Sequence, residues 1–273
     1  GKNKWGYINP KGEVVVPLKY DRAGDFFEGR GAVKREDKWG FVDTKGNMVI
    51  APRYDRVGIF SEGLAMVEKD GRQGFIDRTG KVVIAFQFAS AGPFSNGLAP
   101  VQNARPWGFV DKRGTFQIAP RFGACKPFSE GIAPVMIHRV WGAVDKKGRL
   151  VVPAKYGKVF PFSEGRACVR YPGRVGYEAW DKAIEKTIPR KRENPFGDVY
   201  QGGISYTGTS TFNVIDRQGK RLGPLKDLRI VKCSPFQNGR AQLTIQTRDL
   251  ANPRKSLTKT IVIDRDGNEI TAK

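Results

Sequence analysis

The side chains that most often carry out catalysis are scarce in this sequence. His138 is the only histidine among 273 residues, and no serine or cysteine motif accompanies it as nucleophilic catalysis would require. The sequence contains no His/Cys cluster at metal-ligand spacing and no glycine-rich phosphate loop. We therefore expect a protein that is not an enzyme and has no metal or cofactor, with His138 as a solvent-facing turn residue.

Carboxylates that recur at a fixed spacing offer a second kind of chemistry. Glutamate stands before glycine in four similar segments, at Glu28, Glu62, Glu130 and Glu164, and Asn96 takes the corresponding place in a fifth. A glycosidase needs two carboxylates at one site, whereas these occur once per segment. We interpret them as turn-forming groups.

Basic and aromatic side chains with the same spacing are the best candidates for binding a partner. A basic residue precedes an aromatic one in four segments, and Gln87 takes its place in another. Neighbouring residues of a strand point to opposite faces, so burial of the aromatic would leave an outward basic stripe. Exposed tryptophans could stack on sugars or bases. The basic stripe is equally explained as an ordinary solvated face, and the tryptophans as part of an aromatic core. Both interpretations therefore stay open. The candidate partner-binding residues are Lys19, Arg53, Arg121, Lys155, Trp39, Trp107 and Trp141.

All these residues belong to a tandem repeat with a period of 34 residues. Four series of residues, called ladders below, recur at this interval, and each series keeps one residue type or a close variant of it. Glycine recurs at Gly6, Gly40, Gly74, Gly108, Gly142 and Gly176, phenylalanine at Phe26, Phe60, Phe94, Phe128 and Phe162, a second aromatic at Tyr20, Tyr54, Phe88, Phe122 and Tyr156, and a turn glycine at Gly12, Gly46, Gly80, Gly114 and Gly148. Such agreement in one register indicates one supersecondary unit repeated in order.

The interior of each repeat predicts short strands rather than helices. In residues 54–87 the apolar runs are three to six residues long and are bounded by glycine, aspartate, serine or proline. Asp-x-x-Gly segments such as 43–46 and 77–80 predict hairpin turns in which aspartate accepts backbone N–H groups and glycine takes a positive φ. We expect each Trp-Gly strand to form a hairpin with the strand after this turn, and to be preceded by a strand such as Leu64–Glu68.

The three cysteines are interpreted as core residues. Cys125 and Cys233 occupy one repeat position, three residues before a phenylalanine, where other repeats have valine or alanine. Cys168 occupies a different position, shared with alanine, methionine and proline. Three cysteines cannot all pair within one chain. The sequence predicts no disulfide.

The pattern weakens after the fifth repeat. Residues 1–175 form five regular repeats, and 176–273 are predicted to hold divergent repeats that continue the first part. Asp181–Pro189 reproduces the spacing of an earlier hairpin, and we expect inserted loops at Pro189–Tyr206 and Thr247–Ser256. A divergent terminal repeat is expected because it must cap an exposed sheet edge.

The Lys38–Asp43 run, the Asp-x-x-Gly turns, the Ala-Pro-Arg-Tyr run and the Phe-Ser-Glu-Gly segments resemble the bacterial WG (KWG) repeat family. The resemblance is close over residues 1–175 and loose over 176–273. It implies an all-β bacterial protein, often extracytoplasmic or attached to other domains, with an interaction role and no catalytic residues. Two architectures fit: an open solenoid or superhelix of stacked hairpins, which the equivalent hairpins at residues 4–17 and 260–271 favour, or a β-propeller.

The formal charge of +21 is spread along the chain and favours acidic partners. We expect a protein-interaction or scaffold module that binds an acidic protein, such as an inhibitor or immunity partner of an effector or toxin. The alternative is a binder of an anionic polymer, glycan or nucleic acid, with affinity that falls steeply as salt rises. The same charge is also explained by solubility, without any acidic partner.

No apolar run approaches the about 20 residues that span a bilayer, and no signal peptide is recognisable in residues 1–273. The chain begins at Gly1 rather than at methionine, as a processed or trimmed product would. With the resemblance, this suggests a location in the bacterial cell envelope or outside the cell. The sequence does not fix the oligomeric state.

Overall fold

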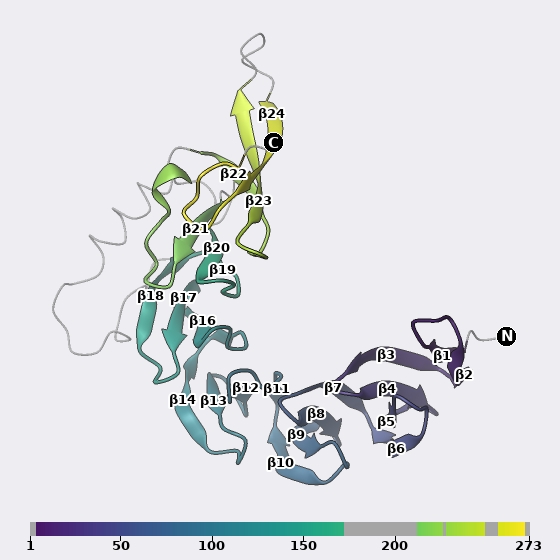
Figure 1. Cartoon of the computed structure of the whole chain (residues 1–273). Coiled ribbons are helices and arrows are strands. Elements are labelled where there is room, and N and C mark those ends of the chain that lie inside the picture. Colours follow the sequence, from purple (N-terminus) through teal and green to yellow (C-terminus); the bar gives the residue numbers. More distant parts are fainter. Residues whose placement is uncertain (1–3, 172–211, 226–227, 249–255, 271–273) are drawn as a thin grey trace. The chain divides into compact units, whose positions relative to one another are not determined.

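The computed structural model describes residues 4–171, 212–225, 228–248 and 256–270 (Figure 1). The chain divides into two compact parts, Gly1–Arg121 and Phe122–Lys273, called the N-terminal and C-terminal parts below. In both parts the described residues form antiparallel β-sheets, most of them four-stranded, and each of these sheets is open. The predicted all-β fold of repeated short strands is confirmed.

In the N-terminal part, one two-stranded sheet is followed by three sheets of four strands, each with its strands side by side in chain order. The first sheet is β1 (Trp5–Ile8) and β2 (Val14–Tyr20). The second is β3 (Arg22–Phe27), β4 (Arg30–Arg35), β5 (Lys38–Asp43) and β6 (Met48–Tyr54). The third is β7 (Arg56–Ser61), β8 (Leu64–Lys69), β9 (Arg72–Asp77) and β10 (Val82–Phe88). The fourth is β11 (Ser90–Ala91), β12 (Ala99–Gln102), β13 (Trp107–Val110) and β14 (Phe116–Phe122), whose last residue begins the C-terminal part.

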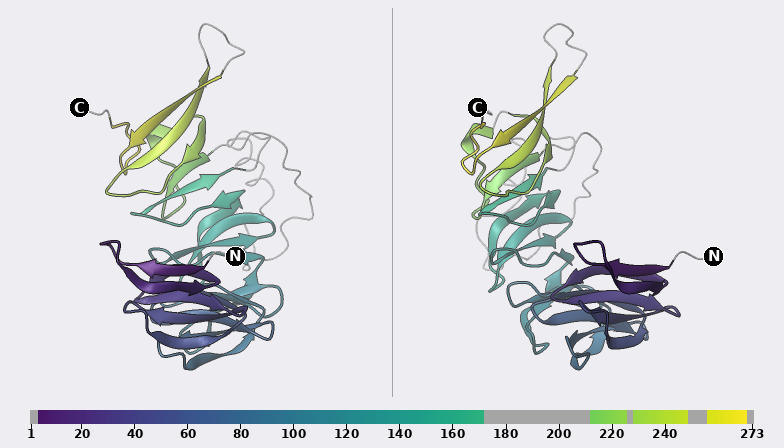
Figure 2. Two further views of the ribbon diagram at one scale, coloured as in Figure 1. Left: turned by 90° about the vertical axis from the view of Figure 1, so that its right-hand side faces the viewer. Right: turned by 45° about the vertical axis from the view of Figure 1, so that its right-hand side comes forward.

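The C-terminal part holds one four-stranded sheet and one of six strands. The first consists of β15 (Ala124–Cys125), β16 (Ile132–Ile137), β17 (Val140–Asp145) and β18 (Leu150–Tyr156). The second consists of β19 (Lys158–Val159), β20 (Arg166–Arg170), β21 (Phe212–Asp216), β22 (Ile230–Cys233), β23 (Ala241–Arg248) and β24 (Ser256–Ile263), with a short 3-10 helix, η1 (Gly223–Leu225), before β22. β23 and β24 form the long hairpin seen in both views of Figure 2.

The C-terminal sheet refines the expectations for the divergent repeats. β20 pairs with β21, so residues 212–216 supply the strand that takes the place of the Trp-Gly strand in this sheet. The expected hairpin at Asp181–Pro189 and the loop at Pro189–Tyr206 lie outside the described residues. The expected loop at Thr247–Ser256 is shorter than predicted, because its first two residues belong to β23 and Ser256 begins β24.

The Asp-x-x-Gly turns form as predicted. In the turn between β5 and β6, one carboxylate oxygen of Asp43 accepts the N–H groups of Lys45 at 2.9 Å and Asn47 at 2.8 Å. Gly46 has a φ of 86°, a left-handed conformation that glycine adopts without steric cost. Because the aspartate satisfies turn donors and the glycine closes the loop, this short sequence fixes where each hairpin reverses.

The glycine at the Trp-Gly position, which follows Gln73 rather than a tryptophan in the third repeat, is required by a close crossing of strands. A Cβ atom on Gly74 would lie 2.6 Å from the carbonyl oxygen of Ile84 on the outer strand β10. The register of β9 and β10 shifts at this point, between the pairs Phe75–Ile84 and Gln73–Phe88. The outer strand therefore bends over the glycine, and only a residue without a side chain leaves room for it.

The core lies between consecutive sheets rather than within one. One cluster joins Phe41 and Tyr54 with Phe60, Val67 and Ile76 of the next sheet. The rings of Phe41 and Phe60 meet edge to face with centroids 4.9 Å apart. Since Phe41, Tyr54 and Phe60 are buried at this boundary, a single sheet cannot bury its own apolar surface, and each depends on its neighbours.

Candidate functional site

The predicted basic ladder lies on the outer strands, next to buried aromatic rings. Lys19, Arg53 and Arg121 are exposed, and Lys155 is half-buried. The aromatic residue that follows each of them is buried, as the alternation of strand side chains predicts. In the N-terminal part these side chains come from β2, β6 and β14, whereas Lys155 comes from β18 in the C-terminal part.

Some ladder side chains also contact their own repeat or the next one. The Lys19 ammonium lies 5.5 Å from the centre of the Tyr20 ring, and the Arg53 guanidinium 5.2 Å from that of Tyr54. Arg53 also donates a hydrogen bond of 3.0 Å to the carbonyl oxygen of Gly80. These contacts hold the side chains in place while their charge stays at the surface.

The predicted tryptophans are half-buried rather than freely exposed. Trp39 stands opposite Tyr54 in the β5–β6 pair, and Trp141 stands opposite Tyr156 in the β17–β18 pair. Trp107 begins β13 and is likewise half-buried. Each therefore presents part of its ring at the surface.

The recurring glutamates are the feature whose role the sequence interpretation did not capture. They do form turns: Glu62 and Gly63 have φ values of 54° and 86°, as the two central residues of a type I′ hairpin turn require. Their side chains, however, reach the next repeat. The Glu28 carboxylate accepts the backbone N–H groups of Glu62 at 2.7 Å and Gly63 at 2.9 Å, and pairs with Arg78 at 2.7 Å.

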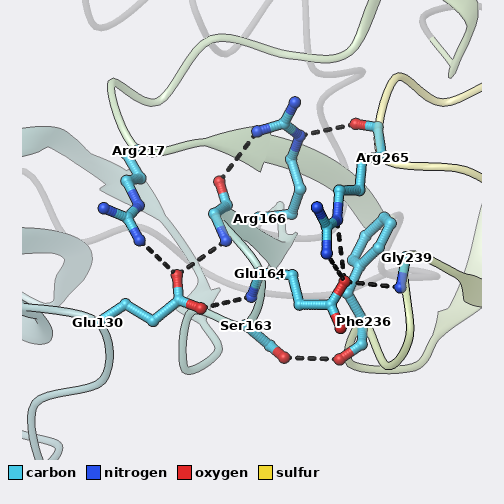
Figure 3. Close-up of polar contacts among 9 residues, drawn as sticks. Glu130, Ser163, Glu164, Arg166, Arg217, Phe236, Gly239 and Arg265 are labelled. Atoms are coloured by element: carbon cyan, nitrogen blue, oxygen red, sulfur yellow. Dashed lines mark hydrogen bonds and ion pairs between the residues drawn. The ribbon is translucent and has the colours of Figure 1, made fainter.

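The same arrangement recurs in the C-terminal part (Figure 3). Glu130 accepts the N–H groups of Glu164 at 2.5 Å and Gly165 at 2.8 Å, and pairs with Arg217 at 2.9 Å. Glu164 in turn accepts the N–H of Gly239 at 2.7 Å and pairs with Arg265 at 2.7 Å. We call each such set of contacts a carboxylate junction.

Serine hydroxyls add a second link across the same boundaries. Ser61 donates to the carbonyl oxygen of Phe94 at 2.7 Å, and Ser163 donates to that of Phe236 at 2.6 Å. Ser129 makes the equivalent bond of 2.6 Å. The Phe-Ser-Glu-Gly segment is therefore a connector, with its ring in the core and its polar side chains on the following turn.

Three of the junctions lower the pKa of their glutamate. The hydrogen bond from the Arg78 guanidinium, with two backbone N–H groups, holds the pKa of Glu28 below its usual value. Arg265 has the same effect on the pKa of Glu164. At Glu130, burial raises the pKa, but the N–H of Gly165 and the Arg217 guanidinium outweigh it and the pKa is lowered. These side chains are therefore held as carboxylates.

A sequence signal for the junctions does exist. The basic partner stands directly after the aspartate of an Asp-x-x-Gly turn in the following sheet, or in the C-terminal sheet for the last two, at Arg78, Lys112, Arg217 or Arg265. In the regular repeats it lies 50 residues after its glutamate. Such a distant pairing is visible only once the period is known and the neighbouring turns are assumed to meet.

The prediction that no disulfide forms is wrong. Cys168 on β20 and Cys233 on β22 are bonded to each other, and Cys125 is free. Cys168 and Cys233 occupy different positions of the sequence repeat, but the two positions meet where consecutive repeats pack. Their counterparts Ala32 and Val57 pack against one core cluster in the N-terminal part. The bond thus replaces an apolar contact of the regular repeats.

The structure also bears on the predicted turn histidine, on metal binding and on membrane spans. His138 is exposed, with a φ of 47° in the turn between β16 and β17. Within the residues that the structure describes, no group of histidine, cysteine, aspartate or glutamate side chains is arranged to hold a metal ion. Over the same residues, no helix has the length and apolar character needed to cross a membrane.

These sheets and junctions define a tandem β-repeat array in which each repeat is completed by its neighbour. The chain belongs to the family described as the WG containing repeat, which matches residues 5–39, 39–72, 74–104, 107–138 and 141–171. The expected family is confirmed. A repeat family with this fold fits a protein-interaction module, because stacked repeats present extended surfaces.

Solved structures show the likeness at the level of fold. A eukaryotic initiation factor structure is 10% identical with a TM-score of 0.54, over 96% of this chain and 68% of the other. The tricorn protease is 11% identical with a TM-score of 0.43, over 86% of this chain, which spans 25% of the protease chain. The WD40 β-propeller domain of Doa1 is 11% identical with a TM-score of 0.38, over 89% and 86% of the two chains. Among curated proteins, no sequence matches this chain.

Proposed function

We propose that this chain is a non-enzymatic interaction module that binds an acidic protein through the outer strands of its repeats. The observation that carries the proposal is the set of Lys19, Arg53 and Arg121, exposed beside buried rings on three of the four outer strands of the N-terminal part, in a chain with a net charge of +21. The outer strand β10 carries Gln87 at this position. A basic surface of this kind speeds the capture of an acidic partner and selects against basic ones.

The recurring carboxylates support a binding role rather than catalysis. Glu28, Glu130 and Glu164 each accept backbone N–H groups and pair with an arginine, and each has a lowered pKa. A general acid needs the opposite, a raised pKa near the working pH. Their chemistry is used to join repeats, which leaves the outer strands as the functional surface.

The half-buried tryptophans extend this surface. Trp39 stands opposite Tyr54 in the β5–β6 pair, and the Arg53 guanidinium lies 5.2 Å from the centre of the same Tyr54 ring. Tryptophan and arginine are the residues that dominate protein interfaces. An inhibitor or immunity role toward an effector or toxin is the specific form of this proposal, with the acidic partner as its target.

The test is capture of partners from a lysate of the source organism, followed by reconstitution with each purified candidate. We expect one acidic protein to be retained in about 0.3 M salt, where phosphate contacts are much weakened. Nuclease-sensitive or polysaccharide material that is released by that salt would replace this proposal with the anionic-polymer alternative.

Matched charge reversals locate the surface. The double variant Lys19→Glu with Arg121→Glu should weaken binding about tenfold, because the two charge reversals together remove roughly 1.4 kcal/mol of binding free energy. Lys45→Glu with Lys81→Glu makes the same change in net charge at exposed turn positions and should weaken binding much less. Equal losses in the two variants would mean that only net charge matters, and the stripe would no longer be the binding site.

A further inference from the structure

The outer strand β10 differs from the outer strands of the other repeats in having neither a proline nor a charge. β2, β6, β14 and β18 each contain one proline and one basic residue of the ladder. β10 spans Val82–Phe88 and has neither, because Phe86 and Gln87 stand where β6 has Pro52 and Arg53. Proline and charge on an edge strand are devices by which natural sheets avoid pairing with another chain. β10 lacks both devices.

The outer edge of β10 presents a backbone N–H group where two of the other outer strands have proline. Within the residues that the structure describes, β10 pairs with β9 alone and ends its sheet (Figure 1). The carbonyl oxygen of Ile84 faces Gly74 of β9, because a Cβ atom on that glycine would lie 2.6 Å from it. The N–H of Ala85 belongs to the same trans peptide and points the opposite way, toward the outer edge. In β2 and β18, Pro17 and Pro153 stand at this position and remove the donor.

Apolar side chains also lie at the surface of this strand. Val82 is 44% exposed and Val83 is 42% exposed. A seven-residue segment with β-branched and aromatic residues, no charge and no proline has the composition of strands that pair with copies of themselves. The ring of Phe86 packs near Tyr54, with centroids 6.3 Å apart, and so holds β10 against the preceding sheet without the proline. The edge is therefore uncharged and preformed.

We propose that the outer edge of β10 binds the same edge of a second copy of this chain, so that two β10 strands pair antiparallel across a two-fold axis. Charge selects this occupant. An acidic partner is drawn to the basic outer strands, whereas β10 offers it no cation and suits another uncharged strand. Each copy brings such a strand in its own residues 82–88. Because one outer strand of the five has this edge, pairing of like edges closes at two copies.

The net charge of the chain gives this dimer a distinctive dependence on salt. Each copy carries a formal charge of +21, and the repulsion between two copies is screened as salt rises. The dimer should therefore strengthen with salt, whereas binding of an acidic protein to the basic strands should weaken. A single pair of strands is a small interface, so we expect a dissociation constant of about 1–100 µM.

The test is sedimentation equilibrium of the whole chain at about 1–300 µM, in about 0.05 M and about 0.5 M salt. We expect monomer and dimer, with more dimer at the higher salt. Gln87→Arg gives β10 the cation of the other outer strands and should weaken the dimer about tenfold, because both copies carry the change. Thr115→Lys is the matched control. It adds the same charge at an exposed turn position, where the preceding repeat has Lys81, and should change the dimer less than about twofold. A chain that stays monomeric, oligomers larger than a dimer, or equal effects of the two variants would overturn the proposal.

Ala85→Pro separates strand pairing from simple apolar contact. It reproduces the proline of β2 and β18, so the fold accommodates it, and it leaves the charge and the exposed valines unchanged. We expect this variant to unfold like the parent chain on heating but to remain monomeric. Amide hydrogen exchange gives a second readout, because exchange in residues 82–88 should slow as the concentration of the parent chain rises, while exchange in residues 116–122 of β14 should not. A dimer that survives Ala85→Pro, or that leaves exchange in residues 82–88 unchanged, uses another surface and refutes the pairing of β10. Neither result would bear on binding of an acidic protein to the basic outer strands.

Discussion

Replacing Glu130 by glutamine tests whether carboxylate junctions hold successive repeats together. Glutamine keeps the shape of the side chain and faces the same positive φ of 52°, so the change isolates charge and acceptor capacity. One glutamate oxygen accepts Glu164 N–H at 2.5 Å, and the other accepts Gly165 N–H at 2.8 Å and the Arg217 guanidinium at 2.9 Å. An amide offers one acceptor oxygen and turns its NH₂ group toward a second donor.

The expected loss follows from these contacts. A hydrogen bond to a charged group contributes about 1.5–3 kcal/mol and a neutral one about 0.5–1.5 kcal/mol, so weakening two of them costs about 2 kcal/mol. The side chain of Glu130 is 26% exposed and Arg217 is 49% exposed, so solvent screening reduces this figure. We expect the free energy of unfolding, measured in urea at neutral pH, to fall by about 1–2 kcal/mol.

The control is Glu269→Gln in the same part of the chain. Glu269 is 44% exposed and pairs with Lys259 at 2.8 Å, but the pair is an ordinary surface contact. Its loss should change stability by less than about 0.5 kcal/mol. If Glu130→Gln and Glu269→Gln have equal effects, the junctions contribute no more than surface ion pairs, and the proposed coupling of repeats through glutamate is refuted.

Three further predictions concern acid, glycine and cysteine. Glu28, Glu130 and Glu164 have pKa values below the ordinary value of about 4.3, so the stability they give is complete above that value and is lost as pH falls through the lower folded-state pKa values. The difference in stability between the parent chain and Glu130→Gln should therefore close in acid, and a difference that persists to about pH 2 would contradict this. Gly74→Ala should cost about 2–3 kcal/mol, because the new Cβ would lie 2.6 Å from a backbone oxygen, whereas Gly58→Ala meets Met66 at an ordinary 3.6 Å and should be nearly neutral in thermal unfolding. A reducing agent or Cys168→Ser should lower stability by about 2–4 kcal/mol, and Cys125→Ala should leave the response to reductant unchanged.

The sequence predicted the repeat, the strands and the turns because these depend on local chemistry. Asp43 and Gly46 form their turn from contacts within a few residues, and the alternation around Tyr54 is set by the geometry of a strand. The family resemblance rests on the same short motifs. Such features can be recognised in one repeat and verified in the next.

The junctions and the disulfide could not be predicted in the same way, because they depend on which positions meet between repeats. Glu28 and Arg78 belong to different motifs, and each has a local explanation as a turn residue. Cys168 and Cys233 lie 65 residues apart in the sequence, while their regular counterparts are separated by much less. The residues between β20 and β21 hide this correspondence, since they interrupt the period at the point where the bond forms.

That interruption has a consequence for how the chain can vary. Arg170 and Phe212 stand directly opposite each other at the ends of β20 and β21. A connection that leaves β20 after the buried Tyr171 and returns at Phe212 therefore joins two neighbouring strand ends. The β20–β21 connection is a natural insertion point, where evolution or an engineer can graft a foreign peptide. Cleavage between the two strands would yield fragments still joined covalently through Cys168 and Cys233, and they would separate on a gel only after reduction.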